Sequence, residues 1–316
     1  MKYDFCTLTD KTYVYRWLAL CNSIDKFMPG SKIWVLCLDR ETEDIIKKLK
    51  RANIETVTVS DLKDASTLGT LRGTRTKQEF AWTCKPAIMH HLLEKKEVEK
   101  MIFVDSDLLF SSSIDPLFEK YADASILITS HKFSEKKAYI ADIVGYYNSG
   151  FIMWRNDEIS LACVTKYKDQ CIEWCHNYHD NGRHGDQSYL KTWPKEFKRV
   201  KEMDEKGVNL GTWNLERYRV RKTHDSFSID SEPLICYHFH GLILYLSGKT
   251  SIRAYPITIH HTGIYGIYIK ELQKAFDEIR TIDPSWEYGF AKKLSFLRII
   301  KQYVTQKIRT LCLHTH

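Results

Sequence analysis

Residues 101–107 read Met-Ile-Phe-Val-Asp-Ser-Asp, an apolar run that ends in two carboxylates one residue apart. Such a run is typical of a buried strand, and residues two apart on a strand point to the same face. If the chain stays extended, Asp105 and Asp107 leave one side of the sheet at the C-terminal end of a strand, where open α/β sheets bind ligands. Two like charges this close need a cation or hydrogen-bond donors, and hard oxygen ligands suit Mg²⁺ or Mn²⁺. A solvated turn is the alternative interpretation.

Alternating strands and helices precede this stretch. Strand-like runs occupy residues 3–8, 32–38 and 55–59, and helical spacing of apolar residues occupies 13–27 and 41–52. A β-α-β-α-β start predicts a parallel, doubly wound sheet of the α/β class. Further along we expect a polar loop over 62–79, a helix opened by Pro86 and strands over 124–129, 146–154 and 234–246. A helix is expected over 160–179. No linker-like composition divides the first 260 residues, so we expect a domain over 1–260 and a helical extension over 261–316.

Composition narrows the classes of protein. Of 316 residues 43% are apolar, enough for a substantial core, and we see neither a signal peptide nor an apolar run long enough to span a membrane. The nine cysteines are expected to be free thiols. Cys171, Cys175 and His179 would share a helix face, which leaves a zinc site as an alternative to ordinary packing.

The positive charge is concentrated at one end of the chain. The net charge is +7, and from Glu287 onward six Lys or Arg residues stand against that one acid, giving +5. Apolar residues recur at helical spacing from Phe290, with basic residues between them. This pattern predicts a basic amphipathic helix on an anionic membrane surface, with packing on the rest of the protein or on another subunit as the alternative. Nucleic-acid binding is disfavoured, because the basic residues alternate with aliphatics rather than with stacking aromatics.

Five short segments with polar or glycine residues follow one another along the chain: Thr7–Asp10, Asp105–Asp107, Asn148–Gly150, Gly185–Gln187 and His238–Gly241. Their order resembles that of the GT-A nucleotide-sugar glycosyltransferases. Most similar is the retaining family that includes glycogenin and the bacterial lipopolysaccharide galactosyl- and glucosyltransferases. The resemblance implies a Rossmann-like GT-A fold, with a mixed, mostly parallel sheet flanked by helices. It also implies a UDP-sugar donor, Mn²⁺ or Mg²⁺, and a glycan or lipid-linked saccharide acceptor in lipopolysaccharide biosynthesis. These implications fit a cytoplasmic enzyme that binds peripherally to the cytoplasmic face of the inner membrane.

The resemblance also implies roles for residues. The metal ligands would be Asp105, Asp107 and His238, with His240 as competitor; we expect one of the two histidines to be a satisfied core residue. Tyr13 would stack on uracil, and Asp186 and Gln187 would act at the reacting carbon. The full set of expected donor-binding residues is Thr7, Thr9, Tyr13, Lys85, Asp105, Ser106, Asn148, Ser149, Gly150, His240 and Gly241.

Some positions stay open. Arg72 and Arg75 compete with Lys85 as donor-contacting cations, and Gly150 could mark a bulge instead of a close approach to a ligand. The loop over 209–214 suits an acceptor or a cap over the site. The family's Lys-Pro-Trp sequence after the histidine motif is absent, so the cation that contacts the diphosphate is not identified.

Three other functions remain as alternatives. In an inverting transferase Asp186 would be the general base. A non-catalytic nucleotide-sugar-binding protein would bind without turnover. A sugar nucleotidyltransferase would carry a glycine-rich signature at the first strand, whereas Arg72-Gly73-Thr74-Arg75 comes much later.

Overall fold

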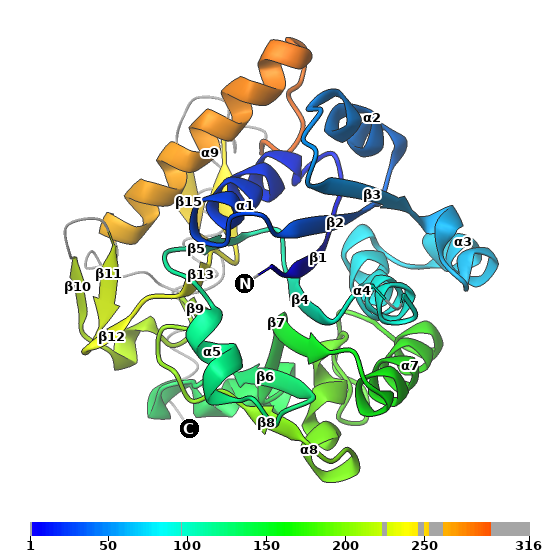
Figure 1. Ribbon diagram of the computed structural model, residues 1–316, viewed down its shortest axis with the longest axis vertical. Coiled ribbons are helices and arrows are strands. Elements are labelled where there is room, and N and C mark those ends of the chain that lie inside the picture. The colour runs from blue at the N-terminus through cyan, green and yellow to red at the C-terminus, as the bar shows by residue number, and fades with distance from the viewer. Residues whose placement is uncertain (1, 96, 223–225, 246–249, 253–261, 292–316) are drawn as a thin grey trace, which may run out of the picture.

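The fold is an open α/β sheet covered by helices on both faces (Figure 1). A computed structural model describes residues 2–95, 97–222, 226–245, 250–252 and 262–291. The main sheet has seven strands in the order β3-β2-β1-β4-β7-β6-β8. β7 runs antiparallel to its neighbours β4 and β6, while the other pairings are parallel. The predicted mixed, mostly parallel sheet is confirmed.

The N-terminal half follows the predicted alternation. Its elements are β1 (Asp4–Thr9), α1 (Val14–Phe27), β2 (Lys32–Cys37), α2 (Arg40–Lys48) and β3 (Ile54–Thr58). β1 and β2 are largely buried apolar runs, as expected of strands covered on both faces. Asp39 caps α2 by accepting a hydrogen bond from the Thr42 amide.

Two predictions before β4 (Lys100–Val104) were wrong. Residues 62–79 are not a loop: a short 3₁₀ turn, η1 (Val59–Asp61), leads into α3 (Ala65–Thr74). Only Leu68 of α3 is buried, so no apolar periodicity marks the helix. Pro86 does not open a helix either, because it lies inside α4 (Lys77–Leu93). The start signal is the capping box of Thr76 and Glu79, a reciprocal pair of hydrogen bonds that outweighs proline as a marker here.

The following elements carry the chain across the rest of the sheet. They are β5 (Leu108–Phe110), α5 (Asp115–Lys120), β6 (Ile126–Ser130), η2 (Glu135–Ile140), α6 (Ala141–Val144), β7 (Tyr147–Arg155), α7 (Glu158–Glu173), η3 (Gln187–Thr192), α8 (Trp193–Glu196) and β8 (Val200–Glu202). α7 ends six residues earlier than predicted, because Trp174 is extended. Cys171 and Cys175 are buried and His179 is exposed, so the expected common helix face does not exist. The eight described cysteines are all free and buried, in accord with packing.

The C-terminal part adds small sheets beside the main one. Its elements are β9 (Leu210–Gly211), η4 (Leu215–Arg217), β10 (Val220–Lys222), β11 (Phe227–Ile229), β12 (Glu232–Pro233), β13 (Cys236–His238), β14 (Leu242–Leu244), β15 (Thr250–Ile252) and α9 (Thr262–Ile282). The single late strand predicted over 234–246 is two strands, separated by a turn in which Gly241 has φ +77°. β13 pairs antiparallel with β5, with His238 opposite Leu108. This pairing brings the histidine segment to the acidic pair.

The long helix α9 lies against α1 (Figure 1). Its buried residues Tyr268, Leu272 and Ile279 belong to the same hydrophobic cluster as α1, and Arg51 donates two 2.9 Å hydrogen bonds to Glu278. The division of the chain at residue 260 stays a prediction. The basic segment predicted from Phe290 lies outside the described residues from 292 onward. Among the described helices, none combines the length and apolarity that crossing a membrane requires.

Candidate active site

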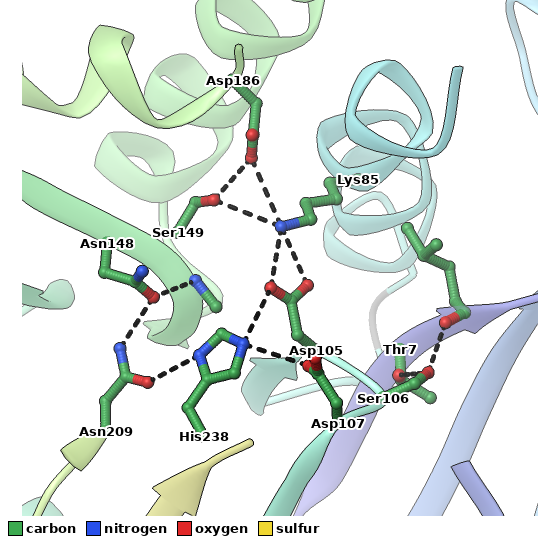
Figure 2. Close-up of polar contacts among 12 residues, drawn as sticks. Thr7, Lys85, Asp105, Ser106, Asp107, Asn148, Ser149, Asp186, Asn209 and His238 are labelled. Atoms are coloured by element: carbon green, nitrogen blue, oxygen red, sulfur yellow. Dashed lines mark hydrogen bonds and ion pairs between the residues drawn. The ribbon is translucent and has the colours of Figure 1, made fainter. Parts of the chain in front are cut away.

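The two carboxylates of the acidic pair face one imidazole ring (Figure 2). His238 Nε2 lies 3.0 Å from Asp107 Oδ1 and 3.9 Å from Asp105 Oδ2. The chain does not stay extended here: the Leu108 amide donates to the Asp105 carbonyl at 3.1 Å, which closes a turn between β4 and β5. The carboxylates therefore converge through a turn and not through strand alternation.

A third side chain completes a possible metal site. One ligand atom each of Asp107, His238 and His240 lies within 4.8 Å of the other two. His238 is buried and His240 exposed. His238 is buried with both ring nitrogens partnered, by Asn209 and by Asp107, while the choice between His238 and His240 as metal ligand stays a prediction.

Asn209 fixes the orientation of His238 (Figure 2). The Asn209 amide nitrogen donates to Thr129 Oγ1 and to Asn148 Oδ1, both at 2.9 Å, so its Oδ1 must be the acceptor for His238 Nδ1 at 3.1 Å. His238 Nε2 then faces Asp107 with its lone pair unless it carries a proton. A ring nitrogen and a carboxylate oxygen 3.0 Å apart share either a proton or a metal ion, so these residues fit a divalent metal ion.

Lys85 connects the acidic pair to Asp186 (Figure 2). Its ammonium lies 2.8 Å from Asp105 Oδ1, 3.6 Å from Asp186 Oδ2 and 3.3 Å from Ser149 Oγ. Burial opposes the charge, but the two carboxylates outweigh it and raise the pKa of Lys85. Burial also disfavours the charged form of Asp105, and the pKa of this carboxyl is therefore raised. Burial would raise the pKa of Asp107 as well, but the interaction with His238 outweighs burial, and the pKa of Asp107 is lowered.

Asp186 is held from two further sides. Ser149 Oγ donates to its Oδ2 at 2.6 Å and the Tyr167 hydroxyl donates to the same oxygen at 2.9 Å. Gln187 donates from Nε2 to the Val144 carbonyl at 2.6 Å, which orients its side-chain oxygen. Asp186 and Gln187 both line the same cavity as the acidic pair, a space of about 510 Å³.

Gly150 is surrounded by site side chains. A Cβ there would lie 2.6 Å from His238 Cε1 and 2.9 Å from both Asn148 Oδ1 and Asp105 Oδ2. The close approach is therefore to the protein's own side chains. The register between β6 and β7 also shifts here, because Ile128 pairs with Ile152 and Thr129 with Asn148. Gly150 therefore lies in the irregular segment of β7, as the bulge considered as the alternative requires.

The first loop supplies another wall of the cavity. Thr9, Asp10 and Tyr13 line it, and Tyr13 is 41% exposed. Thr7 does not: it is buried, 3.3 Å from the hydroxyl of Ser106, which itself lines the cavity. A wall supplied by the first strand's loop is what open α/β sheets offer to a ligand.

Comparison with known proteins agrees with this geometry. The family model described as nucleotide-diphospho-sugar transferase matches residues 31–207, more than half of the chain. The chain belongs to this family. The Bacillus subtilis (strain 168) proteins named Uncharacterized protein YfnF and YfnD are 30% identical over 303 residues and 29% over 299. Each alignment covers 92% of this chain, with 97% of YfnF and 95% of YfnD.

Solved glycosyltransferases share the fold. The galactosyltransferase LgtC, solved with donor and acceptor sugar analogs, superimposes with a TM-score of 0.56 at 16% identity, over 86% of this chain and 95% of its own. GlyE of Streptococcus pneumoniae TIGR4 gives 0.51 at 14% identity, over 93% and 66%. The predicted GT-A fold is confirmed, and this family member is a glycosyltransferase.

Lys85, Arg72 and Arg75 were the cations expected to compete for contact with the donor, and of these three only Lys85 lines the cavity. Arg75 is buried against the carbonyls of Cys171 and Ile172, and Arg72 donates to the Leu38 carbonyl.

Sequence reasoning missed several residues that line the cavity, and it missed the contact of the buried Asn209 with His238; the missed lining residues include Gln78, Trp82, His131, Asn177 and His184. His131 lines the cavity and contacts the Asn148 amide at 3.1 Å; burial lowers its pKa to about 4. Trp213, within the loop expected to cap the site, does line the cavity. Asn209 has φ +51°, which asparagine tolerates better than most residues, but the sequence does not reveal this conformation.

Proposed function

We propose that this protein transfers a sugar from a UDP-sugar to a saccharide acceptor, with retention of the anomeric configuration and with Mn²⁺ or Mg²⁺. The observation that carries the proposal is the cluster of Asp107, His238 and His240 on a wall of the cavity that also contains Asp186 and Gln187. A nucleotide sugar bound there would have its diphosphate at one end and its reacting carbon at the other.

Each residue has a distinct task in this proposal. A divalent cation held by Asp107 and His238, with Asp105 beside them, would supply Lewis-acid stabilisation of the departing UDP. Tyr13 offers an exposed ring for uracil, and Thr9 lies beside it on the same wall. Lys85 holds Asp105 in place through the 2.8 Å ion pair.

Retention is favoured by how Asp186 is held. A general base must point at the acceptor hydroxyl, but Asp186 Oδ2 already accepts from Ser149 and Tyr167 and lies near Lys85. Asp186 is therefore better suited to orient sugar hydroxyls, with the neutral Gln187 amide next to the reacting carbon. The inverting mechanism with Asp186 as base is the second candidate, because this carboxylate does line the cavity.

The α4 side of the cavity suits a saccharide acceptor. Trp82, Gln78, Asn177 and His184 line it. Burial lowers the pKa of His184, so its imidazole is neutral near pH 7. An aromatic face beside neutral hydrogen-bonding groups matches a sugar ring better than it matches a charged ligand.

Gly185 brings this acceptor wall close to the reacting centre. Its φ is +57°, and a Cβ there would lie 3.1 Å from two ring atoms of Trp82. The indole therefore packs against the backbone immediately before Asp186, so an acceptor stacked on Trp82 would lie next to the reacting carbon.

Contact of the C-terminal segment with an anionic membrane is a separate part of the proposal, and it would suit a lipid-linked acceptor at the cytoplasmic face. Phe290, where the amphipathic pattern begins, stacks on Tyr15 with ring centroids 5.5 Å apart. A truncation should therefore keep residue 291. Salt-sensitive binding to anionic vesicles that the truncated protein loses supports this part, and equal binding by both contradicts it.

The test of the reaction is UDP release from a panel of UDP-sugars, with Mn²⁺ or with EDTA. Wild type is compared with Asp107→Asn and with Asp123→Asn, an exposed aspartate outside the cavity. Metal-dependent release from one donor, lost only in Asp107→Asn, supports the proposal and identifies the sugar. Absence of any metal-dependent binding of UDP or its sugars overturns it.

A further inference from the structure

A buried guanidinium that pairs with no carboxylate of the described residues lies beside the donor end of the site. Arg16 of α1 is 4% exposed. Its side chain donates one hydrogen bond, from Nη2 to the Leu242 carbonyl at 3.0 Å. Within the described part of the chain, no carboxylate lies close enough to form a salt bridge with it. Buried charges in proteins are normally paired, so an unpaired one calls for an explanation.

The guanidinium of Arg16 contacts two tyrosine rings and one carbonyl; the Tyr15 ring lies 5.1 Å away, outside the cavity, whereas the other two neighbours belong to the ends of the proposed nucleotide site. Its guanidinium carbon lies 4.4 Å from the ring centroid of Tyr13, the proposed uracil platform. Leu242 directly follows the His238–Gly241 segment.

A nucleoside diphosphate links these two ends. If its base stacks on Tyr13 and its phosphates reach a cation at Asp107, the nucleotide runs from the ring that Arg16 contacts toward the histidine segment that Leu242 follows. Arg16 is not among the residues that line the cavity, so it acts through space from behind Tyr13. Because the guanidinium is already desolvated, a diphosphate gains its attraction without further loss of water from that cation.

We propose that Arg16 is a positioning residue for the donor's diphosphate, whose negative charge is the partner that the buried guanidinium lacks in the ligand-free protein. This inference rests on the proposed function, since it assumes a nucleoside diphosphate in the cavity. It differs from a purely structural role, in which Arg16 only supports the Tyr13 ring and ties α1 to Leu242. The structural role affects the nucleoside and the nucleotide alike, whereas the proposed role affects the phosphates.

The experiment compares the affinities of uridine and of UDP with Mn²⁺ by calorimetric titration. Arg16→Gln removes the charge but keeps a donor for the Leu242 carbonyl, Arg16→Met removes both, and Arg16→Lys keeps the charge. Lys26→Met, an exposed cation of the same helix, is the control. Melting temperatures show which variants are folded, and the two neutral variants guard against one of them failing to fold.

We expect UDP affinity to fall on the order of tenfold to a hundredfold in Arg16→Gln and Arg16→Met, as for loss of a favourable charged interaction. Uridine affinity should change less than about twofold, and Arg16→Lys should keep most of the UDP affinity. Equal losses for uridine and UDP, or no loss for either, overturn the inference. If Arg16→Lys loses as much UDP affinity as Arg16→Gln, the inference is also wrong. Failure of the wild type to bind UDP would instead refute the proposed function.

Discussion

Replacing Asn209 by glycine tests whether this amide sets the metal affinity of the site. Asn209 has φ +51°, so glycine is the substitution that removes the side chain without placing a Cβ in a strained backbone. Three hydrogen bonds are lost, one to His238 and one each to Thr129 and Asn148. At about 1 kcal/mol each, with buried partners left unsatisfied, we expect a loss of about 2–4 kcal/mol in the free energy of unfolding.

The effect on metal binding should exceed what a loss of stability explains. Removing the group that orients a histidine ligand typically weakens metal binding about 10- to 100-fold, which corresponds to about 1.4–2.7 kcal/mol. The assay is calorimetric titration of Mn²⁺ in the presence of UDP, with urea unfolding alongside.

Asn156→Ala is the matched control, because Asn156 also makes two amide hydrogen bonds, to the carbonyls of Lys95 and Val98, but is not part of the cavity. It should lose stability and keep Mn²⁺ affinity. If Asn209→Gly binds Mn²⁺ as tightly as wild type while losing stability, the amide has only a structural role and the reasoning is refuted.

Three further outcomes are expected. Gly150→Ala would press a methyl group against His238 and should lower turnover about 100-fold, whereas Gly73→Ala, which meets nothing within 4 Å, should keep full activity; equal activities would contradict this. Lys85→Met leaves the buried Asp186 and the half-buried Asp105 without their cation and should cost about 3 kcal/mol in urea unfolding at pH 7; a loss below about 1 kcal/mol would be inconsistent with these ion pairs. His131 has its pKa lowered to about 4. Between pH 6.5 and 4 the unfolded chain therefore binds more protons and stability falls as pH falls, by up to about 3 kcal/mol from this group. His131→Gln should flatten that fall in denaturation curves, and an unchanged pH profile would argue against it.

The parts of the fold that were predictable are those written in continuous apolar runs. β2 and β4 contain such runs, and β1 alternates apolar residues with threonines; together with the helices between them they predict the parallel start of the sheet. α4 was misjudged because Pro86 was taken as its first turn, although the Thr76–Glu79 capping box marks the true start. The late strand was misjudged because apolar character continues through Gly241, whose positive φ reverses the chain.

The site was predictable where its chemistry is local in sequence. Asp105 and Asp107 stand together at a strand end, and the structure does gather them with His238. Asn209 could not be assigned to His238, because the pairing of β9 with β13 brings together residues 29 apart. The unpaired state of Arg16 was hidden for the same reason, since only the packing of α1 against the Leu242 segment buries it.

The most direct test of the central claim is a crystal structure with UDP and Mn²⁺, using anomalous scattering to locate the metal. We predict an anomalous peak about 2.1 Å from Asp107 and His238 ligand atoms, also coordinated by diphosphate oxygens, with uracil on Tyr13. A UDP molecule bound elsewhere, or bound in this cavity with no metal at Asp107 and His238, would contradict the account.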